Sequence, residues 1–119
     1  MMQKMMVLIQ GDFVAPRFDL ATEVLMVQFD KGNVIGEPKM IIMERSSDEA
    51  LCQMAVEENI TDIICGGIEE VHYNFLVWKK VAVLDAVIGN WRKAVEKGVA
   101  GTLSQGEILH SNKDESLTL

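Results

Sequence analysis

The 119-residue sequence has few of the side chains on which disulfide and metal scaffolds depend. It contains two cysteines and two histidines, too few for a disulfide framework or for a zinc site with four cysteine ligands. It also lacks a long hydrophobic run, because the apolar stretch Met5–Ile9 stops at Gln10, far short of a signal or membrane segment. We therefore expect a cytoplasmic protein with free thiols and no membrane partner.

Basic residues are also scarce. Eleven lysines and arginines stand against eighteen acidic residues, for a net charge of −7. Binding to nucleic-acid phosphates needs a concentration of positive charge, so the balance argues against a nucleic-acid partner. The length and the 49% hydrophobic content are those of one globular domain with a single core.

The hydrophobic pattern divides the chain into alternating strands and helices. Strands are expected at 5–9, 23–29, 34–43, 60–65 and 81–84, and helices at about 46–59, 69–80 and 91–101. Ser46 and Glu49 have the spacing of a capping box at the start of the first helix. Pro38 cannot donate to a strand ladder, which places its strand at a sheet edge. The order predicts a mixed α/β sheet with helices on its faces.

The last part of the chain has a different character. Residues 104–119 are polar and show no period, so we expect a domain over 1–103 followed by a mobile C-terminal tail.

Ligands of such sheets bind at the carboxyl ends of the parallel strands. Three segments are expected to meet there: the loop 11–19, the segment 65–67 and the segment 85–89. They bring five candidate side chains toward one crevice: Asp12, Arg17, Asp19, Cys65 and Asp85.

The segment Cys65-Gly66-Gly67 supports two interpretations. In the first, the glycines let a backbone approach an anionic ligand, the N–H groups at the following helix start bind it, and the Cys65 thiolate is a soft ligand. In the second, the glycines make a tight turn and Cys65 is a small buried hydrophobe, which is the common state of a free cysteine. The orientation of the thiol discriminates between them.

The other polar candidates also have two interpretations. Arg17 could clamp an anionic ligand or form an ion pair with Asp12 or Asp19. His72 is expected on a helix surface, His110 in the tail, and Cys52 in the packing of the first helix. No arrangement assembles a nucleophile, its base and an oxyanion donor.

Three segments in order resemble one known family. Val14–Ala21, with the sequence Val-Ala-Pro-Arg-Phe-Asp-Leu-Ala, is similar to the first hallmark of the dinitrogenase iron–molybdenum cofactor biosynthesis proteins. Asp62–Ile68 resembles the second hallmark, and Val81–Leu103 resembles the C-terminal segment. The resemblance covers about residues 5–103. Nitrogenase accessory members commonly carry a histidine, taken as a cluster ligand, where this chain has Arg17.

The resemblance implies a ribonuclease-H-like three-layer fold with a five-stranded mixed sheet in the order β-β-β-α-β-α-β-α. It also implies binding, carrying or inserting an anionic metal–sulfur cluster that contains molybdenum, iron or both. Arginine does not ordinarily ligate a metal, although it can pair with an anionic cluster. Cys65 is then the only soft ligand at the crevice.

These observations lead to one principal hypothesis and two alternatives. The principal one is a non-catalytic cluster carrier whose cofactor-binding residues are Asp12, Arg17, Cys65, Gly66 and Gly67, with Cys65 as the metal ligand. It predicts that Cys65→Ser weakens cluster uptake and that Cys52→Ser does not. The first alternative is an interaction module that docks on a metalloenzyme or cluster-assembly protein without a cluster, through the edge strand around Pro38 or the tail. The second is a small enzyme acting on a phosphorylated or carboxylated metabolite.

Overall fold

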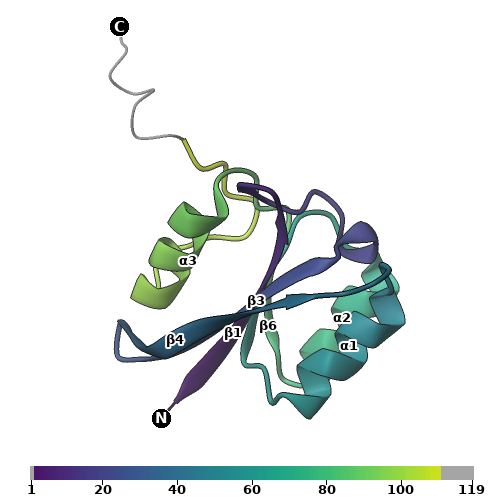
Figure 1. The fold of residues 1–119 in the computed structure, drawn as a ribbon, viewed down its shortest axis with the longest axis horizontal. Helices are drawn as coiled ribbons and strands as arrows, with labels where there is room; N and C mark the ends of the chain where they lie inside the picture. Colours follow the sequence, from purple (N-terminus) through teal and green to yellow (C-terminus); the bar gives the residue numbers. More distant parts are fainter. Residues whose placement is uncertain (1, 111–119) are drawn as a thin grey trace, which may run out of the picture.

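The computed structural model describes residues 2–110 and consists of one mixed sheet with helices on both faces (Figure 1). The strands are β1 (Gln3–Gln10), β2 (Phe13–Val14), β3 (Glu23–Asp30), β4 (Asn33–Ile42), β5 (Asp62–Ile64) and β6 (Ala82–Leu84). The helices are α1 (Asp48–Glu57), α2 (Glu70–Trp78), α3 (Trp91–Ala100) and the short 3₁₀ helix η1 (Phe18–Leu20). None of the helices in this described part is long and apolar enough to cross a membrane.

The sheet has six strands, and not the five that were predicted. Five of them follow the order β4-β3-β1-β5-β6, and the additional strand β2 pairs with β1 off this path. Strand β1 is antiparallel to β2 and β3 and parallel to β5, which is parallel to β6. The sixth strand is two residues long, too short to show any hydrophobic period in the sequence.

Strand β1 is the centre of the molecule because both of its faces are covered. Met6 and Leu8 point into a core with α1 and α2, and Met5, Val7 and Ile9 point into a second core with α3. Side chains alternate across a strand, so an uninterrupted apolar run fills both layers at once. Figure 1 shows the same arrangement, with α1 and α2 on one side of the sheet and α3 on the other.

Strand β4 lies at the sheet edge, as Pro38 predicts. Its register against β3 shifts between Met26 and Gln28 on that strand, which face Lys39 and Ile35. The three residues between Ile35 and Lys39 therefore bulge out of the ladder, and they include Pro38 and Gly36, whose φ is +70°. A proline without an N–H group fits this position because no ladder bond is required there.

Helix α1 begins one residue later than the predicted capping box. Its N-cap is Ser47, whose hydroxyl accepts a hydrogen bond from the Ala50 N–H at 3.1 Å. Ser46 therefore lies outside the helix. The amphipathic helix α3 is capped by Asn90, whose side chain accepts from the N–H groups of Arg92 and Lys93, and it ends at Gly101 in the left-handed region, as predicted.

Candidate functional site

The carboxyl ends of β1, β5 and β6 enclose a cleft of about 560 Å³, which we call the sheet-end cleft. The three segments that the sequence places there all contribute to it. Its lining consists of Gln10, Phe13, Val14, Pro16, Gly66, Gly67, Ala86, Val87, Ile88 and Gly89. The volume lies within the range typical of small-ligand sites, and most of the lining is apolar.

Gly66 and Gly67 line the cleft, but their N–H groups already have partners. The Gly66 N–H donates to the Ala15 carbonyl at 3.0 Å, and the Gly67 N–H donates to the Pro16 carbonyl at 2.7 Å. A Cβ at Gly66 would lie 2.4 Å from the Ala15 oxygen and 2.5 Å from the Pro16 oxygen. Gly66 is therefore required for the close approach of two loops, and neither amide is free to bind an anion as predicted.

Cys65 lies beneath the cleft and not in its wall. Its side chain is fully buried in the core shared with α1 and α2. Burial, with a smaller contribution from Asp85, raises the pKa of the Cys65 thiol to about 12. A cysteine that ligates a metal has to present an accessible thiolate, so this geometry agrees with the second interpretation of Cys65, as a buried hydrophobe.

Of the four charged candidates, Arg17, Asp19 and Asp12 form ion pairs, and Asp85 accepts a hydrogen bond from Gln105. Arg17 donates through Nε and Nη2 to both carboxylate oxygens of Asp19, at 3.1 and 2.6 Å. This pair raises the pKa of Arg17 and lowers that of Asp19. The Arg17 Nη1 group takes part in neither bond, and the backbone at Arg17 pairs with Gly67 at the cleft. Asp12 pairs with Arg92 at 3.3 Å.

Residues 104–110 are part of the predicted tail, yet the structure packs them along the cleft segment 85–89. The Ile88 N–H donates to the Glu107 carbonyl at 3.0 Å, and the Leu109 N–H donates to the Ile88 carbonyl at 2.7 Å. The Glu107 carboxylate also pairs with Lys97 on α3. These backbone bonds order a segment that has no hydrophobic period. The expectation for residues 111–119 falls outside the described residues.

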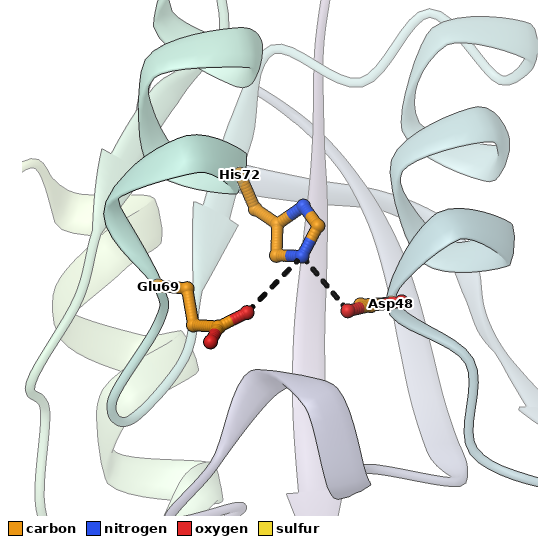
Figure 2. Close-up of side chains that lie close together, drawn as sticks. All are labelled: Asp48, Glu69 and His72. Carbon is orange, nitrogen blue, oxygen red and sulfur yellow. Dashed lines mark hydrogen bonds and ion pairs between the residues drawn. The ribbon is translucent and has the colours of Figure 1, made fainter.

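A second group of side chains was not predicted from the sequence. His72 in the first turn of α2 lies between two carboxylates, Asp48 at the start of α1 and Glu69 at the N-cap of α2 (Figure 2). Its Nε2 is 2.8 Å from Asp48 Oδ2 and 3.6 Å from Glu69 Oε1. The spacing of Glu69 and His72 on one helix is visible in the sequence, but the contact with Asp48 depends on the packing of the two helices.

Comparison with known proteins relates the chain to others mainly through its fold. No family model matches it, and no curated protein matches it by sequence. Among solved structures, a candidate dinitrogenase from Methanocaldococcus jannaschii is 26% identical, with a TM-score of 0.70 over 88% of this chain and 95% of that one.

Two further structures share this fold at lower identity. The apo form of the orange protein from Desulfovibrio gigas is 17% identical, with a TM-score of 0.69 over 88% of this chain and 93% of that one. A candidate NifB protein from Thermotoga is 14% identical, with a TM-score of 0.65 over 92% of this chain and 99% of that one. The chain therefore has the mixed α/β fold that these three solved structures share.

Proposed function

We propose that this protein is a non-catalytic carrier that binds an anionic metal–sulfur cluster, containing molybdenum, iron or both, in the sheet-end cleft. The observation that carries the proposal is the cleft itself, formed by the three loops at the carboxyl ends of β1, β5 and β6. The fold shared at 26% identity with a candidate dinitrogenase supports this choice of ligand class.

The lining of the cleft indicates how a cluster would be held. With Cys65 buried and both glycine amides occupied, the cleft offers shape and apolar contacts. Beside it, the exposed Arg17 guanidinium is paired with Asp19 but keeps its Nη1 group outside that pair, and this group can contact an anionic cluster. A cluster held without a covalent bond to the protein can be passed to an acceptor, which is the property that a carrier needs.

The proposal includes the family that the sequence resembles. The motifs at Val14–Ala21 and Asp62–Ile68 form the two loops that hydrogen-bond to each other beside the cleft. The strand order β4-β3-β1-β5-β6 supports the ribonuclease-H-like description of the fold. These features support our proposal that the chain belongs to the iron–molybdenum cofactor biosynthesis proteins; we also propose that it acts in the cytoplasm.

A second candidate function is docking on a metalloenzyme or cluster-assembly protein. It is favoured by β4, which is exposed along nearly its whole length and carries the exposed apolar side chains Val34, Met40 and Ile42. The two functions are compatible, because a carrier has to contact the protein that receives its cluster.

The carrier proposal is tested by anaerobic reconstitution with sulfide and iron, molybdate or copper, followed by visible absorption. Ile88 lines the cleft and is 60% exposed, so Ile88→Glu adds a repelling charge without disturbing the core. Val34→Glu is the matched control, since Val34 is 46% exposed at the opposite end of the sheet.

The expected result is a coloured wild type, a weakened Ile88→Glu variant and an unaffected Val34→Glu variant. Arg17→Gln should also weaken uptake. Because its thiol is buried, Cys65→Ala should leave uptake intact, which replaces the expectation drawn from the sequence. A colourless wild type in every reconstitution would refute the carrier function. Equal uptake by both glutamate variants would show that the cluster does not bind in the sheet-end cleft.

A further inference from the structure

We propose that Asp48, Glu69 and His72 form a binding site for a divalent first-row transition-metal ion. The site lies between the N-termini of α1 and α2, and none of its three residues lines the sheet-end cleft. The inference does not depend on the carrier function, because it concerns a single ion and different residues.

The positions of the three ligand atoms suit one ion. One nitrogen of His72 and one oxygen from each carboxylate all lie within 4.8 Å of one another. Ligands bound to one tetrahedral ion at about 2.0–2.2 Å are separated by about 3.3–3.6 Å. Side-chain movements of roughly 1 Å would therefore bring all three atoms into coordination.

The charges of the group also favour a divalent ion. Two carboxylates face one imidazole, so a protonated His72 balances only one of the two negative charges. A divalent cation balances both of them and binds the neutral imidazole through Nε2. One nitrogen and two carboxylate oxygens suit ions such as Zn²⁺, Co²⁺, Mn²⁺ and Fe²⁺.

The surroundings hold the ligands in place. Asp48 accepts the Glu49 N–H through Oδ1 at 2.7 Å, which leaves Oδ2 for His72 or an ion. The other ring nitrogen, Nδ1 of His72, is 3.9 Å from the Cys52 sulfur, and the ring packs against Phe18. A contact at Nδ1 fixes the orientation of a histidine that binds metal through Nε2.

One side of the site is open. The Glu69 side chain is 69% exposed, whereas those of Asp48 and His72 are 34% and 17% exposed. Glu69 also makes no capping bond with its side chain, so no cap has to break when its carboxylate turns onto an ion. Three protein ligands with an open position are typical of sites that exchange a water molecule or a second ligand.

The test is a titration of the reduced protein with Zn²⁺ by calorimetry, and with Co²⁺ by visible absorption, in the absence of sulfide. We expect one ion per chain and a Co²⁺ spectrum without a thiolate charge-transfer band. His72→Gln and Glu69→Gln should each weaken binding at least about tenfold. His110→Gln and Glu70→Gln are the matched controls, one for each residue type, and should bind as the wild type does.

Each other outcome overturns the site. If the wild type binds fewer than one ion per chain, or if His72→Gln and His110→Gln bind the ion with equal affinity, the three side chains form an ion pair only. A thiolate band would assign the ion to a cysteine. If circular dichroism shows that His72→Gln does not fold, Glu69→Gln carries the test, because its exposed side chain supports no other element.

Discussion

Replacing Gly66 by alanine tests whether the two motif loops are held together by direct backbone contact. The added Cβ would lie 2.4–2.6 Å from the Ala15 oxygen and from the Pro16 oxygen and carbonyl carbon. These are backbone atoms, so they cannot rotate away. Overpacking of this kind costs about 1–3 kcal/mol. Weakening the hydrogen bonds from Gly66 and Gly67 adds about 0.5–1.5 kcal/mol for each bond.

The expected loss in the free energy of unfolding is therefore about 2–6 kcal/mol, a large part of the roughly 5–15 kcal/mol of an ordinary domain. Gly67→Ala is the matched control, because a Cβ there would meet only the Pro16 oxygen at 3.5 Å, an ordinary contact. It should cost less than about 1 kcal/mol. Urea unfolding followed by far-ultraviolet circular dichroism measures both. Equal stabilities for the two variants would refute the reasoning.

Two further predictions concern the thiols and the first helix. Burial raises the pKa of Cys65 to about 12 and that of Cys52 to about 11, from an ordinary 9.0. As the pH rises, the thiols of the unfolded chain therefore lose their protons before those of the folded chain. The free energy of unfolding should fall above about pH 9 for this reason. The midpoints of urea unfolding at pH 8 and pH 10 measure this fall in stability, and Cys65→Ala should make it smaller. Fast reaction of the thiols of the folded protein with a thiol reagent at pH 8 would contradict the prediction. Ser47→Ala should cost about 1 kcal/mol by removing the cap of α1. Ser46→Ala should cost much less, and the reverse order in thermal melts would restore the predicted capping box.

Much of the fold is predictable from local patterns. The apolar run at Met5–Ile9 predicts a strand that is buried on both faces, and β1 is such a strand. Pro38 predicts an edge strand because it lacks an N–H group, and β4 is one. In both cases the information lies in side-chain hydrophobicity or backbone chemistry that acts within a few residues.

The features that were not predicted depend on distant backbone or side-chain partners. Residues 104–110 are ordered by backbone hydrogen bonds to the segment 85–88, and such bonds do not depend on the side-chain pattern. The Gly66 amide could be assigned to a ligand only while its partner, the Ala15 carbonyl, was unknown. His72 and Asp48 are 24 residues apart in the sequence, with the rest of α1 and the strand β5 between them, so only the packing of α1 against α2 reveals their contact.

The two edges of the sheet restrict how another protein can attach to this one. Strand β6 is three residues long, and the ladder of β4 is interrupted by the bulge that contains Gly36 and Pro38. Neither edge offers a long continuous row of free backbone groups to an incoming strand. A partner that docks on this chain would therefore have to recognise its side chains. Dissociation of such a complex would break no hydrogen bonds between paired strands, which suits a transient interaction.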